Sequence, residues 1–179
     1  MLFPNNIYSQ FILYVFKYYK YFHSFFRYNM SMNNKLNAPF TLGFYGQSGV
    51  GKTYLVRQIV SQLIGEGFHV AVIKVSDKAV SIDTEGKDTY LYGKAGAETV
   101  VFSTASESTF LIKRPLSTKE IVRLLGENEN YDFIFIEGAL EEWIPKVRLG
   151  EMQLRENTIL TYTGDYDALI TQIKNKDLK

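Results

Sequence analysis

Residues 46–53 read Gly46-Gln47-Ser48-Gly49-Val50-Gly51-Lys52-Thr53 and fit the pattern G-x-x-x-x-G-K-[ST]. The apolar run at 40–45 is typical of a short buried strand, and after the motif apolar residues recur at helical spacing as far as Gly65. Glycines let such a loop turn its backbone N–H groups toward a phosphate, and the following helix adds the positive end of its dipole. The stretch therefore predicts a phosphate-binding loop in which Lys52 contacts the β- and γ-phosphates and Thr53 ligates Mg²⁺.

Strand-like and helix-like segments alternate along the rest of the chain. Short apolar or β-branched runs predict strands at 70–75, 99–102, 110–113, 133–136, 146–149 and 158–162. Start and stop signals predict helices at 88–95, at 118–125 with a stop at Gly126, and at 166–174. This alternation indicates an α/β fold of the three-layer phosphate-loop NTPase type, with a mostly parallel sheet that has a mixed edge.

The bulk composition limits the classes of function. At 179 residues the chain is long enough for one well-packed domain, which we expect at 39–176. The net charge of +1 provides no general basic surface for nucleic acid. Because the chain has no cysteine, disulfides and thiolate zinc sites are excluded, which fits a cytoplasmic location. The two histidines, His23 and His69, lie in different segments, which argues against a histidine metal site.

The N-terminal segment differs in composition from the rest. Twelve aromatic residues precede Ser31, and the first acidic residue is Glu66. Two lysines, Lys17 and Lys20, interrupt the apolar run, which argues against a transmembrane span. We expect residues 1–38 to be a disordered extension, or translation to begin at Met30 or Met32 so that the residues before it are not translated. A helix that lies on a membrane surface is the alternative.

Two acidic residues are expected at the ligand-binding edge of the sheet, beyond the carboxyl ends of the strands. Glu137 directly follows the strand at 133–136, a position from which it can hold Mg²⁺ through water or polarise an attacking water. Asp83 lies in the loop after the strand at 70–75. The alternatives are a carboxylate that caps local backbone for Glu137 and a turn residue before Gly86 for Asp83. Position favours function for Glu137 and does not separate the two interpretations of Asp83.

Several further segments follow the phosphate-binding loop in a characteristic order. They are Val72-Ile73-Lys74, Ile82-Asp83, Gly86-Lys87-Asp88-Thr89-Tyr90, Ala95-Gly96-Ala97, Ile136-Glu137-Gly138 and Pro145-Lys146-Val147. In order and spacing they resemble the MobB family, molybdopterin-guanine dinucleotide biosynthesis protein B, from about Phe40 to the last expected helix. Many families share the phosphate-binding loop, whereas a Gly-Lys-Asp-Thr block followed by Ala-Gly-Ala and Glu-Gly is specific.

The resemblance implies a GTP-binding accessory protein of molybdenum-cofactor maturation, usually a homodimer, with at most slow GTP hydrolysis. It also implies that the protein works beside a separate guanylyltransferase that joins GMP to molybdopterin. By this analogy residues 46–53 bind the phosphates of GTP together with Mg²⁺, and Asp83 and Glu137 are the acids near the metal. Lys87 and Asp88 belong, by the same analogy, to the characteristic loop near the nucleotide.

The chain departs from the family pattern at three places outside the phosphate-binding loop. Val75-Ser76-Asp77 stands where the family commonly has a His-Thr sequence after the lysine that matches Lys74. Leu91 replaces an arginine, and Ala139-Leu140 replaces Phe-Lys after Glu-Gly. These departures leave the nucleotide site intact and leave open the contacts to a pterin or a partner. A diverged paralogue that serves another cofactor pathway would show them too.

Two other functions stay open at this point. A dethiobiotin-synthetase-like ligase or kinase also has Glu-Gly after a strand, but it needs an acceptor pocket, for which the chain offers only Arg114, Lys146 and Arg148. A partition ATPase is disfavoured, because Gln47 stands where that loop has a second lysine. The second function that stays open, besides the ligase or kinase, is a nucleotide-gated adaptor that docks its aromatic N-terminus on a membrane or a partner.

The tail Asn175-Lys176-Asp177 lacks the spacing of a guanine-reading motif, so the preference for GTP over ATP rests on the resemblance alone.

Overall fold

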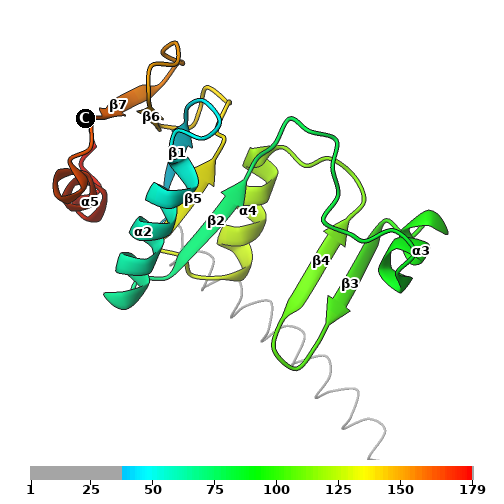
Figure 1. The fold of residues 1–179 in the computed structure, drawn as a ribbon. Helices are drawn as coiled ribbons and strands as arrows, with labels where there is room; N and C mark the ends of the chain where they lie inside the picture. The colour runs from blue at the N-terminus through cyan, green and yellow to red at the C-terminus, as the bar shows by residue number, and fades with distance from the viewer. Residues whose placement is uncertain (1–37, 179) are drawn as a thin grey trace, which may run out of the picture. The chain divides into compact units, whose positions relative to one another are not determined.

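The structure is a computed structural model that describes residues 38–178 (Figure 1). The aromatic segment at 1–37 and the expectations attached to it lie outside the described residues. Between residues 38 and 178 no helix is both long enough and apolar enough to cross a membrane. From Phe40 onward the chain forms one unit, and its strands form a five-stranded sheet and a separate two-stranded sheet.

The five-stranded sheet is parallel throughout and has the strand order β2-β5-β1-β6-β7. Its strands are β1 (Phe40–Tyr45), β2 (Val70–Lys74), β5 (Phe133–Glu137), β6 (Lys146–Leu149) and β7 (Thr158–Tyr162). All five residues of β5 are buried, as expected for a strand with a neighbour on each side and helices on both faces. The α/β fold with a mostly parallel sheet is thus confirmed.

Helices cover both faces of this sheet and complete three layers. On one face, α2 (Lys52–Gly65) and α5 (Tyr166–Asn175) pack on the side chains of Leu42, Phe44, Phe133 and Phe135. On the other face, α4 (Thr118–Asn128) packs on a cluster that includes Ile134 and Ile136. Successive β5 residues therefore belong to opposite core clusters, as the two-residue period of a strand requires.

The two-stranded sheet pairs β3 (Thr99–Ser103) with β4 (Ser108–Ile112) in antiparallel register. The short helix α3 (Asp88–Lys94) precedes β3 and makes contacts with it. The strands expected at 99–102 and 110–113 therefore form a sheet of their own, and the expectation of a mixed edge on the large sheet is wrong. We call residues 83–113 the hairpin region.

The expected elements are all present, and their bounds differ from the expected ones by at most two residues except at the end of α4. Gly126 does not stop α4, which continues to Asn128, because a glycine inside a helix weakens it without blocking its hydrogen bonds. The start of α4 is well defined by a capping box, in which Ser117 and Glu120 each bond the other's backbone N–H.

Candidate nucleotide-binding site

The phosphate-binding loop connects β1 to α2 and leaves the first turn of that helix without a side-chain cap. Gly51 stands at the N-cap with a φ of 94°, a left-handed conformation that favours glycine. No side chain caps the helix and no acidic residue lies in its first turn. By contrast, Ser117 caps α4 and Asp165 caps α5. The N–H groups at the start of α2 can therefore bond an anion that the chain itself does not supply.

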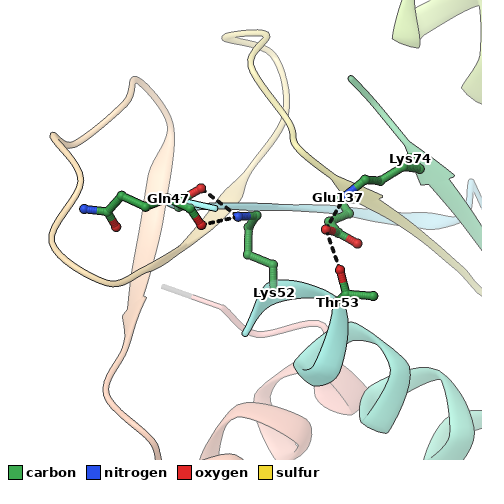
Figure 2. Close-up of polar contacts among 6 residues, drawn as sticks. Gln47, Lys52, Thr53, Lys74 and Glu137 are labelled. Atoms are coloured by element: carbon green, nitrogen blue, oxygen red, sulfur yellow. Dashed lines mark hydrogen bonds and ion pairs between the residues drawn. The ribbon is translucent and has the colours of Figure 1, made fainter. Parts of the chain in front are cut away.

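Lys52, the first residue of α2, folds back over the loop that precedes it. Its Nζ donates to the carbonyl oxygens of Gly46 at 2.7 Å and Gln47 at 2.5 Å (Figure 2). Burial lowers the pKa of Lys52, the charge of Glu137 opposes this, and the charge of Lys74 adds to it. The ammonium group is thus held at the loop, where it can bond a phosphate oxygen.

Glu137 ends β5 beside Thr53, as the sequence predicted for an acid at this edge of the sheet. Only 7% of its side chain is exposed. Thr53 Oγ1 donates to Glu137 Oε1 at 2.9 Å, and Lys74 Nζ forms an ion pair with the same oxygen (Figure 2). Burial alone would raise the pKa of Glu137, but the hydrogen bonds from Lys74 and Thr53 and the charges of Lys74 and Lys52 outweigh it and lower the pKa. Glu137 is therefore a carboxylate at neutral pH.

Thr53 and Glu137 present the oxygen atoms that a magnesium ion prefers. The Thr53 hydroxyl can keep its hydrogen on Glu137 and still offer a lone pair to a cation. Among the described residues, no three acidic or histidine side chains gather around a point that could hold a metal ion. A magnesium ion at this place would thus need phosphate oxygens as additional ligands, which is how Mg²⁺ is commonly bound. The residues present fit a nucleotide-bound Mg²⁺.

Gly138 brings the segment after Glu137 against the segment after β2. Its φ is 85°, and a Cβ atom there would lie 2.6 Å from the carbonyl oxygen of Val75. Val75 donates its N–H to the carbonyl of Glu137 at 2.9 Å, and Gly138 donates to Phe44 at 2.9 Å. The ends of three neighbouring strands are thus tied together around Glu137, with no room for a side chain at 138.

Asp83, the second predicted acid, bonds within the hairpin region. Its side chain is 4% exposed, and it accepts from Thr89 Oγ1 at 2.7 Å and Lys113 Nζ at 2.6 Å. The hydrogen bond from Lys113, followed by that from Thr89, lowers the pKa of Asp83. The structure therefore gives Asp83 a local role, and its role at the metal stays a prediction. Lys87 and Asp88 are exposed at the start of α3, and their proximity to a nucleotide also stays a prediction.

Lys74 is the site residue to which the sequence assigned no role. It is the last residue of β2 and stands directly opposite Glu137 in the register of β2 and β5. The sequence contained the signal, because both strands were expected to end at the same edge of the sheet. A lysine at the end of an apolar strand nevertheless resembles an ordinary surface residue, so only the pairing of β2 with β5 identifies its partner.

A buried lysine supports the loop on its other side. Lys146 has no exposed surface, and its Nζ donates to the carbonyls of Ile144 at 2.9 Å and Glu156 at 2.7 Å. Burial, with a contribution from the charge of Arg155, lowers the pKa of Lys146. The bond to Glu156 holds the loop between β6 and β7, in which a Cβ on Gly150 would lie 2.8 Å from Gln47 Oε1. The phosphate-binding loop thus packs against the β6–β7 loop, which the bond from Lys146 holds in place.

Residues 41–174 match the family described as MobB, molybdopterin guanine dinucleotide synthesis protein B. The chain belongs to the MobB family. A relative in Haemophilus influenzae, named molybdopterin-guanine dinucleotide biosynthesis adapter protein, is 30% identical over 125 residues, which are 69% of this chain and 68% of that protein. A relative in Methanocaldococcus jannaschii is 30% identical over 141 residues, which are 76% of this chain and 56% of that protein.

A solved MobB structure shares the fold of this chain. The crystal structure of Bacillus subtilis MobB aligns with a TM-score of 0.62 at 21% identity, and the alignment covers 78% of this chain and 98% of that one. At this identity the likeness concerns the fold alone. Three of the departures from the MobB pattern adjoin the end of β2 or β5: Val75 touches Gly138, Ala139 is buried and Leu140 is 53% exposed. Leu91 lies in α3 and is also 53% exposed.

Proposed function

We propose that this protein binds Mg²⁺–GTP and acts as an accessory protein in the synthesis of molybdopterin-guanine dinucleotide. The observation that carries the proposal is the convergence of Lys52, Thr53 and Glu137 at an uncapped helix start, in a chain of the MobB family. The relatives' name, molybdopterin-guanine dinucleotide biosynthesis adapter protein, supports the pathway. The family resemblance supports guanine as the base.

Different groups of the chain bind different parts of the nucleotide and its metal ion. The N–H groups at the start of α2 and the Lys52 ammonium bond the phosphates. The Thr53 hydroxyl and the Glu137 carboxylate hold Mg²⁺, the latter through water. When bound, the metal neutralises phosphate charge. Glu137 is also the acid that orients a water for hydrolysis, and its existing bonds to Thr53 and Lys74 are consistent with slow turnover.

We further propose that the accessory role is exerted through protein contacts, both to a guanylyltransferase and to a second copy of this chain. The hairpin region supports self-association, because Val101 and Phe110 face each other in the register of β3 and β4 and are 49% and 69% exposed. A two-stranded sheet is marginal by itself, and a partner strand or face would bury these side chains.

Two of the three basic residues that a ligase or kinase could use in an acceptor pocket have other contacts. Lys146 is buried and bonds only to backbone carbonyls among the contacts seen, and Arg148 donates to Thr161 Oγ1 at 3.2 Å and to the carbonyl of Met152 at 2.9 Å. Neither group is presented to an acceptor. No observation in the described residues favours this function over the MobB one.

Titration calorimetry with GTP, GDP and ATP in the presence of Mg²⁺ tests the nucleotide proposal. We expect GTP to bind more tightly than ATP, and Lys52→Ala to abolish binding of both because it removes the phosphate-contacting ammonium. Glu137→Gln should slow any hydrolysis while sparing affinity for GTP. Tighter binding of ATP than of GTP would contradict the proposal, and an unchanged hydrolysis rate would remove Glu137 from the water-orienting role.

A further inference from the structure

We propose that Lys74 is a second phosphate-contacting lysine, which exchanges Glu137 for the terminal phosphate of a nucleoside triphosphate and thereby makes the site prefer triphosphate over diphosphate. The inference rests on the proposed nucleotide-binding function and adds a residue that neither the motif nor the family name assigns. It is carried by the position of Lys74, its exposure and its partner.

Lys74 and Thr53 contact the same carboxylate oxygen. Glu137 Oε1 accepts from Thr53 Oγ1 at 2.9 Å and is ion-paired with Lys74 Nζ (Figure 2). One oxygen atom therefore separates the Lys74 ammonium from the hydroxyl at which Mg²⁺ is expected. If Mg²⁺ and a terminal phosphate were held beside this hydroxyl, the phosphate would therefore come close to Lys74.

The two lysines of the site differ in how firmly they are held. Lys52 donates to two carbonyls of its own loop, so its ammonium stays close to the backbone. Lys74 has one partner among the contacts seen, Glu137, and 61% of its side chain is exposed. Four rotatable bonds let a lysine of this exposure turn its ammonium to a new acceptor at little conformational cost. Of the two, Lys74 is the one that can move.

Charge explains why Lys74 should move only for a triphosphate. A magnesium ion beside Thr53 would add two positive charges close to the Lys74 ammonium, and both would compete for Glu137. The extra negative charge of a terminal phosphate gives Lys74 a stronger acceptor and relieves that competition. A diphosphate offers no such acceptor. Lys74 would then remain paired with Glu137, and its positive charge would weaken the binding of Mg²⁺.

Calorimetry on full-length protein tests this with a non-hydrolysable GTP analogue and with GDP, each in Mg²⁺. We expect Lys74→Met, which keeps the length and removes the charge, to weaken binding of the analogue about tenfold or more. The same variant should change GDP affinity by less than about threefold. Lys74→Arg should recover most of the loss, since it keeps a charged donor. Lys78→Met, an exposed lysine four residues further on, serves as the matched control.

The outcomes separate this inference from the broader proposal. Equal weakening of both nucleotides by Lys74→Met, with a lowered melting temperature, would make Lys74 a structural residue and overturn the inference. Unchanged binding of the analogue would overturn it as well. In either case tight GTP binding by the wild type that is lost in Lys52→Ala would leave the proposed function standing. A wild type that binds neither nucleotide overturns both.

Discussion

The five-stranded sheet and the β3–β4 hairpin are built from similar apolar residues but bury their side chains to different extents. In the large sheet, Phe133 and Phe135 are fully buried between helices. In the hairpin, Phe102 and Phe110 are 51% and 69% exposed. The large sheet therefore carries the candidate nucleotide site on a well-buried core, whereas the hairpin exposes apolar surface that another molecule can cover. Under the proposed function, nucleotide and protein partners would therefore bind at different regions of the molecule.

Truncation of a buried aromatic residue should have the largest effect. Phe135→Ala leaves a cavity between β5 and the helices and should lower the free energy of unfolding by about 3–5 kcal/mol. Phe110→Ala, the matched change on the hairpin, should lower it by less than about 0.5 kcal/mol in dilute monomer. Urea denaturation followed by circular dichroism measures both. Similar losses in the two variants would contradict the contrast between the regions.

Removal of a helix cap should have a smaller effect on the same core. Ser117→Ala deletes the side chain that accepts from Glu120 N–H at 3.2 Å and so leaves that donor at the start of α4 unsatisfied. We expect a loss of about 1 kcal/mol in the free energy of unfolding. Ser61→Ala, an exposed position inside α2, should cause no loss and is the control. A neutral Ser117→Ala would mean that α4 is held by packing alone.

The ionisation of Glu137 should give the large sheet a weak dependence on pH. Its pKa is lowered in the folded state, so its contribution to stability is complete above the ordinary glutamate pKa and is lost as the pH falls through the lowered value. Because Lys74 is largely exposed, we expect less than about 1 kcal/mol. Denaturation curves across acidic pH should show a slope that is reduced in Glu137→Gln. An equal slope in both proteins would show that other groups cause it.

Charge on the hairpin face should change association while leaving the fold almost unaffected. Phe110→Glu places a carboxylate among exposed apolar side chains, where a partner surface would have to desolvate it. We expect the proposed dimer to dissociate, with a change in monomer stability within about 0.5 kcal/mol and unchanged affinity for nucleotide. Light scattering with size-exclusion chromatography measures the mass. A dimer that survives this change would place the interface elsewhere, and Leu154→Glu, an exposed position in the β6–β7 loop, is the control.

The residues near the motif could be predicted from the sequence because their chemistry is local or follows from strand direction. Gly46 to Thr53 form the loop after β1 and the first residues of α2, and Glu137 meets Thr53 because β1 and β5 are parallel and end at one edge. Strand pairing is not encoded locally, so the partnership of Lys74 with Glu137 and the separation of β3 and β4 from the large sheet were not predicted. The contacts of Asp83 depend on Lys113, thirty residues away.

The contact between Gly138 and the Val75 carbonyl bears on how this site can diversify. Lys74 and Glu137 each lie one residue before that contact, so a side chain at 138 would displace both members of the ion pair at once. Val75, Ala139 and Leu140, where the chain departs from the family pattern, stand at or just after the same point. Gly138 thus separates the ion pair before it from the departures after it, of which Ala139 is buried and Leu140 is exposed. A substitution at the exposed Leu140 would therefore leave Lys74 and Glu137 in place, whereas one at Gly138 would not.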